Sequence, residues 1–180
     1  PPVEGMRGAL GVDHVGAAAE MTRRLIDLGH RRIGLIEGRA DQSASADRRQ
    51  GAQAAVEAAQ GVELLIVRGQ FTYRSGFEAA RRLLAPHPRP TALFAGNDDM
   101  AAGALAAVHA AGLQTPGDVS IAGFDDTYLA ASVWPALTTI RQPVAEMARR
   151  AALRLAGKEV LDTQFVEHRL IERESTASPR

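Results

Sequence analysis

The sequence predicts an α/β protein, built as a three-layer, doubly wound parallel sheet with helices on both faces. Three observations support this fold class. Four short apolar runs recur roughly every 30 residues, a stretch with helical spacing of apolar residues joins each run to the next, and glycine or proline closes these stretches. Repeated strand–helix–strand units imply parallel strands joined by right-handed crossovers. A chain of 180 residues is long enough for one domain with a substantial core.

The first half of the chain contains the first two strands. Residues 1–11 are rich in proline and glycine and are interpreted as a linker. Asp13 can cap a helix over about residues 14–28, and Gly29 is placed to end it. The next elements are a strand, a polar loop, a helix and a second strand, expected at about 32–36, 38–45, 46–60 and 62–67.

The second half continues the pattern and then changes. A helix, a strand, a helix and a fourth strand are expected at about 75–85, 91–95, 99–111 and 119–122, with a proline cluster ending the first of them. Beyond Asp125 we expect an irregular stretch, a short strand, a helix, an edge strand and a frayed tail, at 127–136, 137–140, 144–156, 165–171 and 174–180.

Composition excludes several classes of protein. Basic and acidic residues both number 21, so the chain lacks the basic excess expected of a domain that itself holds nucleic acid. No apolar run approaches the ~20 residues of a membrane span, and nothing at the start resembles a signal peptide. The sequence has no cysteine, and its five histidines have no metal-binding spacing, so no metal or cofactor is expected.

The turn after the third strand is Asn97-Asp98-Asp99. Asp98 or Asp99 can cap the following helix, which would leave Asn97 free at the carboxyl end of the strand, where α/β sheets place their ligands. The alternative is that Asn97 and Asp98 are turn and cap residues only. The neighbouring strand ends decide between these interpretations.

Side chains that suit contact with a ligand follow all four predicted strands: polar ones after three of them and an aromatic one after the second. Because the carboxyl ends of parallel strands meet at one edge, we expect these loops to face one crevice. A guanidinium, an aromatic face, an amide and carboxylates together suit a polyhydroxylated ligand, whose hydroxyls both donate and accept hydrogen bonds. The residues concerned are Ser43, Ser45, Asp47, Arg48, Phe71, Asn97, Asp99, Asp125 and Asp126.

A catalytic constellation is not found. Asp125 follows a strand and could act as a phosphoryl-accepting nucleophile, but the segment lacks the Asp-x-Asp-x-Thr spacing of such enzymes. No Gly-x-Ser-x-Gly element occurs, and the early glycines precede the first strand–helix unit, which is the wrong place for a dinucleotide loop. The expected protein is therefore not an enzyme.

Four segments and the closing stretch resemble the effector-binding part of LacI/GalR-type transcriptional regulators, over about residues 9–176. They are Leu28–Gly34, Asn97–Gly103, Val119–Asp126, Pro135–Pro143 and Arg169–Ser175. The Leu-Thr-Thr-Ile-Arg-Gln-Pro element within the fourth is typical of regulators. The resemblance implies a two-lobed clamshell with an effector between the lobes. Residues 12–134 and 162–175 would form the C-terminal lobe, 135–161 would belong to the N-terminal lobe, 1–11 would be a remnant of its linker, and 176–180 a tail.

The resemblance also assigns roles. Arg48, Phe71, Asn97 and Asp125 match positions that contact the effector, and Asp99 matches a variable position that sometimes does. It implies a cytoplasmic homodimer that binds a sugar, a nucleoside or a sugar phosphate, and that reaches operator DNA only through a domain absent from this chain. Two departures from the family pattern are Ala44, where many members have a hydroxyl, and His14, where asparagine is commoner.

Two alternatives of other classes remain open at this stage. One is a periplasmic sugar-binding protein of a transport system, and the other is an α/β hydrolase that depends on Asp125. The helix at 144–156 adds a structural expectation, since its apolar stripe would have no partner within the chain. Val144, Met147, Ala148, Ala151 and Leu155 form that stripe.

Overall fold

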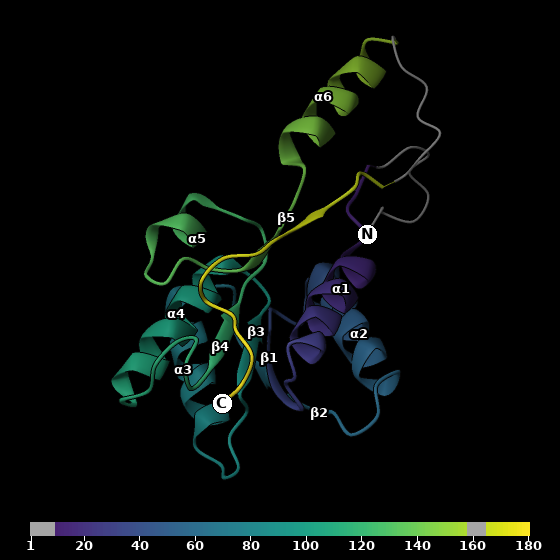
Figure 1. The fold of residues 1–180 in the computed structure, drawn as a ribbon. Coiled ribbons are helices and arrows are strands. Elements are labelled where there is room, and N and C mark those ends of the chain that lie inside the picture. The colour runs from purple at the N-terminus through teal and green to yellow at the C-terminus, as the bar shows by residue number, and fades with distance from the viewer. Residues whose placement is uncertain (1–9, 158–164) are drawn as a thin grey trace.

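The computed structural model describes residues 10–157 and 165–180, and its centre is a parallel sheet of four strands in the order β2-β1-β3-β4. Figure 1 shows the strands side by side between layers of helices. Their bounds are β1 Arg32–Glu37, β2 Glu63–Arg68, β3 Ala92–Ala95 and β4 Ser120–Ala122. Strand β2 lies on one side of β1, whereas β3 and then β4 lie on its other side. The direction in which successive strands are added to the sheet therefore reverses between β1 and β3. The carboxyl ends of these two strands therefore flank the switch point, where open α/β sheets bind ligands.

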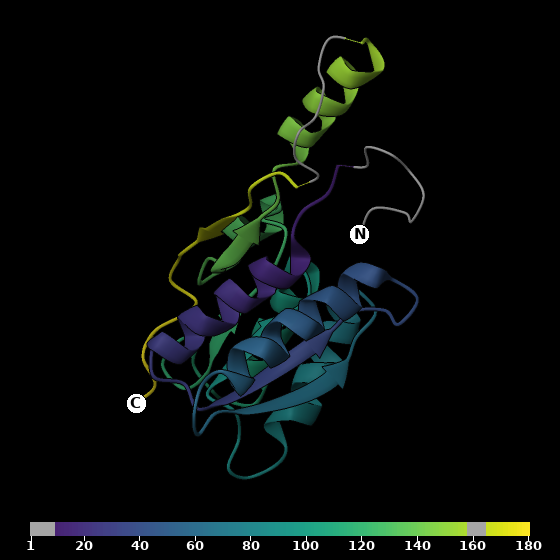
Figure 2. The ribbon, with the colours of Figure 1, turned by 90° about the vertical axis from the view of Figure 1, so that its right-hand side faces the viewer.

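Two helices cover each face of the sheet. The pair α1 (His14–Asp27) and α2 (Ser43–Glu57) lies on one face, as Figure 2 shows, and α3 (Tyr73–Leu84) with α4 (Asp98–Ala110) lies on the other. This arrangement confirms the predicted three-layer α/β fold.

Alternation along β1 explains why both faces are covered. Ile33 and Leu35 pack in the cluster that includes α1, whereas Ile36 packs in the cluster of α3 and α4. All three side chains are buried. A strand that is apolar on both faces can be stable only between two layers of helices.

Glycine allows α3 and α4 to approach closely. A Cβ atom on Gly76 would collide with the backbone of Met100, and one on Gly103 would collide with the carbonyl oxygen of Tyr73. Neither obstacle is a flexible side-chain end, so the two helices would have to move apart to admit a methyl group.

We therefore expect Gly103→Ala to lower the free energy of unfolding by about 1–3 kcal/mol, the usual cost of overpacking, despite the higher helix propensity of alanine. Urea unfolding followed by circular dichroism measures it. Gly11→Ala is the control, because a Cβ atom there would meet only the Phe165 ring at 3.8 Å, an ordinary contact. Equal stability of the two variants would contradict the packing argument.

A second, two-stranded sheet follows the main one along the chain. Strand β5 (Thr139–Arg141) pairs antiparallel with β6 (Arg169–Ile171). Leu137, Thr138, Thr139 and Ile140 are completely buried, and Leu137 and Ile140 belong to the two core clusters of the main body. Residues 137–140, which belong to the segment 135–161 that the resemblance assigns to the other lobe, thus pack in the core of the described body. The lobe boundaries stay predictions.

Helix α6 (Val144–Leu155) projects away from the body, beyond β5 (Figure 1). None of its residues is buried, and Val144 and Leu155 at its two ends are 65% and 91% exposed. The predicted apolar stripe is therefore uncovered in this structure.

The expectation of a frayed tail is wrong. Ser175 is completely buried; its hydroxyl donates to the carbonyl oxygen of Ile121 at 2.6 Å and accepts from the amide of Thr138 at 2.8 Å. Two residues later the amide of Ala177 donates to the hydroxyl of Ser120 at 3.0 Å. The tail therefore covers the outer edge of β4 and ties it to the chain before β5.

Two further local expectations need correction. The stretch 127–136 contains a short helix, α5 (Tyr128–Ser132), and α2 begins at Ser43 instead of residue 46. The predicted linker 1–11 and the start of 162–175 lie mostly outside the described residues. Within the described part of the chain, no helix is long and apolar enough to cross a membrane.

Candidate functional site

Arg48 and Asp125 meet at the carboxyl edge of the sheet, although α2 carries one and the loop after β4 the other. Their Nη2 and Oδ1 atoms lie 3.6 Å apart. The Nη1 atom of Arg48 also donates to the carbonyl oxygen of Gly96, the residue after β3. The guanidinium thus joins two of the strand ends from which the sequence predicted a site.

The guanidinium of Arg48 is buried and tightly held. Its Cζ atom lies 3.7 Å from the centroid of the Phe124 ring, and its side chain is only 8% exposed. Burial lowers the pKa of Arg48 to about 10, against the opposing charge of Asp125, so the group is charged at neutral pH. Its Nε atom is buried without a hydrogen-bond partner. A buried cation with an unused donor is a costly arrangement, which is typical of binding sites.

His14 completes this cluster, and sequence reasoning left it uninterpreted. The Nη2 atom of Arg48 lies 3.4 Å from His14 Nδ1, and the His14 and Phe124 ring centroids are 5.7 Å apart. Burial and the adjacent Arg48 charge lower the pKa of His14 to about 4, so the neutral ring can accept from the guanidinium. The only signal in the sequence was the departure from asparagine at this position.

A pH dependence follows for His14. Because its folded pKa lies below the ordinary value, the unfolded chain binds more protons between about pH 4 and 6.5. The contribution of His14 to stability is therefore complete above pH 6.5 and is lost as the pH falls to about 4. We expect the free energy of unfolding to differ less between pH 4.5 and pH 7.5 for His14→Asn than for the wild type. His87→Asn, in an exposed loop, is the control and should leave the difference unchanged.

Asp125 has a second partner within the protein. The Nε2 atom of Gln142 donates to Asp125 Oδ1 at 2.5 Å. Burial raises the pKa of Asp125, whereas the charge of Arg48 acts in the opposite direction. Gln142 was not among the predicted site residues, although it lies in the Leu-Thr-Thr-Ile-Arg-Gln-Pro element that carried the resemblance.

The expected capping of α4 by Asp98 or Asp99 is wrong, because Asn97 is the cap. Asn97 Oδ1 accepts from the amide of Met100 at 3.0 Å, and Asn97 Nδ2 donates to the carbonyl oxygen of Phe71 at 3.2 Å. Both polar atoms of Asn97 therefore already have partners. Asp98 is completely buried, and its carboxylate accepts a hydrogen bond from the amide of Thr127. Asp99 is exposed.

Phe71 lies beside this amide, with a positive φ of 59°. Its ring packs so closely on Gly38, the residue after β1, that any Cβ atom there would overlap it. The structure thus brings Phe71 and Asn97 together, and Arg48 and Asp125 together. Ser43, in the first turn of α2, is exposed like Asp99.

The assembled groups are suited to hydrogen bonding and not to nucleophilic chemistry. The cation of Arg48, the carboxylate of Asp125 and the side-chain amide of Gln142 converge, with the ring of Phe124 against the guanidinium. Hydroxyl groups of a ligand can donate to Asp125 and accept from Arg48 or Gln142. Within residues 10–157 and 165–180, no three His, Cys, Asp or Glu side chains are placed to hold a metal ion.

Comparison with known proteins gives consistent relatives. The family of periplasmic binding protein-like domains matches residues 22–176. The chain is 39% identical over 171 residues to the HTH-type transcriptional regulator CelR of Thermobifida fusca, an alignment that covers 91% of this chain and 50% of that protein. The chain therefore spans about half the length of this curated relative.

Two solved structures are also similar. A sugar-binding LacI-family transcriptional regulator from Escherichia coli, complexed with phosphate, has a TM-score of 0.87 at 33% identity, covering 94% of this chain and 63% of that one. The complex of the transcriptional regulator CelR with cellobiose has a TM-score of 0.82 at 36% identity, covering 97% and 56%.

Proposed function

Because this chain belongs to the family of periplasmic binding protein-like domains of LacI-type transcriptional regulators, we propose that it senses a small sugar-like effector for such a regulator. The relatives named above are transcriptional regulators, which favours regulation over transport or catalysis. The effector would bind between this lobe and a second one and shift the population toward the closed clamshell. That shift would change how DNA-binding heads elsewhere in the protein engage an operator in the cytoplasm.

The Arg48–Asp125 pair is the observation that carries this proposal. Arg48 contacts Gly96 at the end of β3, beside the switch point of the sheet. Phe124 packs against the guanidinium of Arg48, and Gln142 donates a hydrogen bond to Asp125. Charge-assisted hydrogen bonds contribute roughly 1.5–3 kcal/mol each, so a few of them with one ligand support micromolar binding. A sugar is the class we favour, because one relative has been solved with cellobiose. Nucleosides and sugar phosphates offer similar hydroxyls and are tested beside it.

The test is NMR titration of ¹⁵N-labelled protein with cellobiose, ribose, adenosine and glucose 6-phosphate at millimolar concentration, since one lobe supplies only part of the contacts. We expect one of the four to shift amides around Arg48 and Asp125, and Asp125→Asn to lose those shifts. Glu57→Gln, which removes an exposed carboxylate at the far end of α2, should keep them. Shifts confined to other parts of the sheet would show that the site is misassigned.

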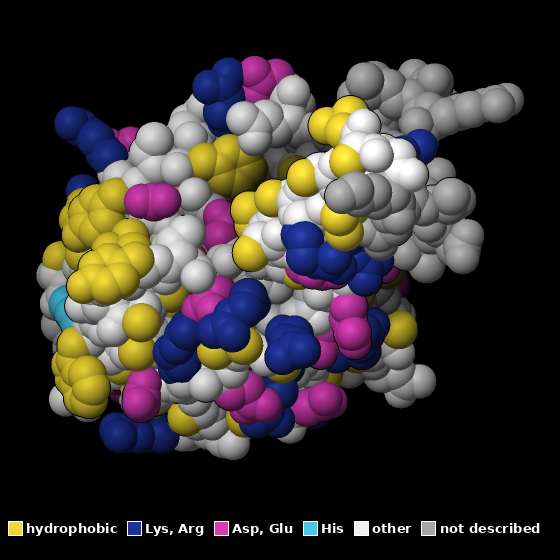
Figure 3. Space-filling model, turned by 90° about the horizontal axis from the view of Figure 1, so that it is seen from above, with side chains coloured by type: hydrophobic (Ala, Val, Ile, Leu, Met, Phe, Trp, Pro, Cys, Tyr) yellow, Lys and Arg dark blue, Asp and Glu magenta, His cyan; other side chains and the backbone are white. Residues whose placement is uncertain are grey.

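We also propose that the chain forms a homodimer through the body of this lobe. Tyr128 and Trp134 are 90% and 79% exposed, which is unusual for side chains of this size. Figure 3, seen from the α6 end, shows hydrophobic side chains exposed both on one side of the body and over the projecting helix.

Sedimentation velocity distinguishes these two surfaces. We expect a dimer that Trp134→Ser converts to monomer, because large aromatic side chains dominate interface energetics. Leu155→Ser, at the exposed end of α6, should leave the dimer intact. The reverse result would place the interface on α6.

A further inference from the structure

The loop between β4 and α5 has a strained backbone that surrounding contacts hold in place. Asp125 and Asp126 are consecutive residues with positive φ, at 114° and 56°. Such a conformation costs on the order of 1–3 kcal/mol for each residue without glycine's freedom, and it persists only where the surroundings determine it. The contacts of this loop with neighbouring segments therefore stabilise its conformation.

The backbone of the loop is joined to β5. The amide of Asp125 donates to the carbonyl oxygen of Ile140 at 2.8 Å, and the amide of Gly123 donates to that of Thr138 at 2.8 Å. Backbone hydrogen bonds therefore join the loop directly to the strand that leads to α6.

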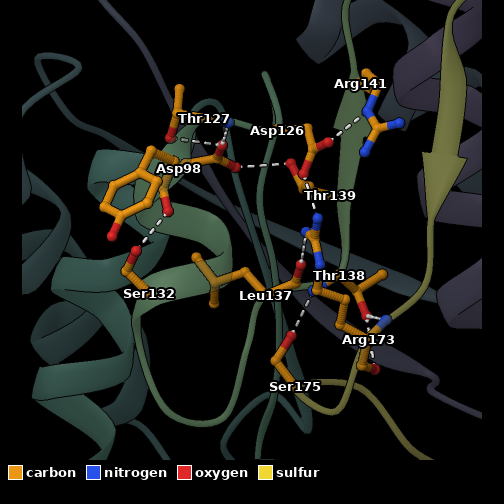
Figure 4. A network of polar contacts seen from close by, with 11 residues as sticks. Asp98, Asp126, Thr127, Ser132, Leu137, Thr138, Thr139, Arg141, Arg173 and Ser175 are labelled. Atoms are coloured by element: carbon orange, nitrogen blue, oxygen red, sulfur yellow. Dashed lines mark hydrogen bonds and ion pairs between the residues drawn. The ribbon is translucent and has the colours of Figure 1, made fainter.

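The carboxylate of Asp126 joins the same loop to both strands of the small sheet (Figure 4). Its Oδ2 atom accepts from Arg141 Nε, on β5, and its Oδ1 atom from Arg173 Nη2, just after β6, each at 2.5 Å. The Asp126 side chain is only 5% exposed. Arg173 also donates to the carbonyl oxygen of Leu137 at 2.7 Å. One carboxylate thus fixes the strand that enters α6 and the strand that returns to the body.

Adjacent carboxylates in this loop therefore have separate partners. Asp125 contacts Arg48 and Gln142, whereas Asp126 contacts Arg141 and Arg173. Although burial acts against it, hydrogen bonds from the two arginines hold the pKa of Asp126 below its usual value. The group is thus an anion at neutral pH, as an ion-pair link requires.

We propose that Asp126 is a positioning residue that transmits changes at the Arg48–Asp125 pair to β5 and β6. Its meaning for regulation rests on the proposed function, since these strands would lead to and from the second lobe. The transmission itself needs no ligand, so it is tested independently of effector binding.

Hydrogen–deuterium exchange of the 180-residue chain tests the link, read at residues 139–142 and 169–173. We expect Asp126→Asn to raise exchange there at least tenfold and to leave β1 and β3 unchanged. Glu172→Gln is the matched control, because Glu172 is also a carboxylate beside β6 but pairs with Arg24 of α1, at 2.6 Å. Equal effects of the two variants, or a rise throughout the main sheet, would overturn the proposal.

A mutant cycle separates transmission from a purely structural role. Arg48→Met removes the charge beside Asp125 and leaves both arginine partners of Asp126 in place. Arg48→Gln is a second variant that also removes this charge. We expect the Arg48 variant to change exchange at residues 169–173 at least threefold, and this change to disappear in the Asp126→Asn background. No change at all, or the same change in both backgrounds, would show that Asp126 does not carry the coupling.

Discussion

Replacing Asp98 by alanine is expected to lower the free energy of unfolding by about 3–5 kcal/mol, because it leaves several hydrogen-bond donors without an acceptor. Asp98 is completely buried at the start of α4. Its carboxylate accepts from Thr139 Oγ1 at 2.6 Å, from the amide of Thr127 at 2.7 Å and from Thr127 Oγ1 at 3.1 Å (Figure 4). The substitution would therefore separate α4 from both the loop after β4 and strand β5.

Asp99→Ala is the matched control for this prediction. The two residues are neighbours in the first turn of α4, but Asp99 is exposed, so its loss should change stability by less than about 0.5 kcal/mol. Urea unfolding of both variants at pH 7 gives the comparison. A loss below 1 kcal/mol for Asp98→Ala would mean that water or neighbouring groups replace the carboxylate.

Asp98 also shows where reasoning from the sequence stops. The regular spacing of strands along the chain correctly predicted the three-layer α/β fold. Local residues also determined the ends of α1 as expected, with Asp13 at its start and Gly29 just after its end. Three polar residues compete for one cap at the start of α4. Which of them takes it depends on Thr127 and Thr139, which lie 29 and 41 residues further along the chain.

The remaining differences have the same origin in contacts between distant segments. The usual behaviour of terminal residues suggested a frayed tail, but the buried hydroxyl of Ser175 forms hydrogen bonds with Ile121 and Thr138. His14 meets Arg48 over 34 residues of sequence. For the candidate site, the convergence of strand ends predicted that Arg48 and Asp125 would approach each other. It could not predict that the side chain of Asn97 forms hydrogen bonds with the backbone of Met100 and Phe71.

The second large effect concerns Arg48, whose replacement by methionine should weaken binding of the sugar found by titration at least a hundredfold, or about 2.7 kcal/mol. Losing two charge-assisted hydrogen bonds to ligand oxygens is sufficient for such a change. Stability should change by less than about 2 kcal/mol, because losses and gains largely offset each other. The carbonyl oxygen of Gly96 loses a donor and Asp125 loses its counter-charge, although Asp125 is 28% exposed and keeps the hydrogen bond from Gln142. In return, a buried cation with an unused Nε atom is removed and methionine keeps the contact with Phe124.

The control for Arg48 is the next residue on α2. Arg49 pairs with Glu37 at 3.5 Å and is 43% exposed, so Arg49→Met removes the same charge without touching Asp125. We expect it to bind the sugar within threefold of the wild type. If Arg48→Met bound normally, the buried guanidinium would be a structural group and the effector would contact other residues. If both variants lost binding equally, the general charge of α2 would attract the ligand. Only a loss of binding confined to the Arg48 variant would connect the buried guanidinium to function. Buried charged groups that lower stability are common at ligand-binding sites, where the ligand interacts with them.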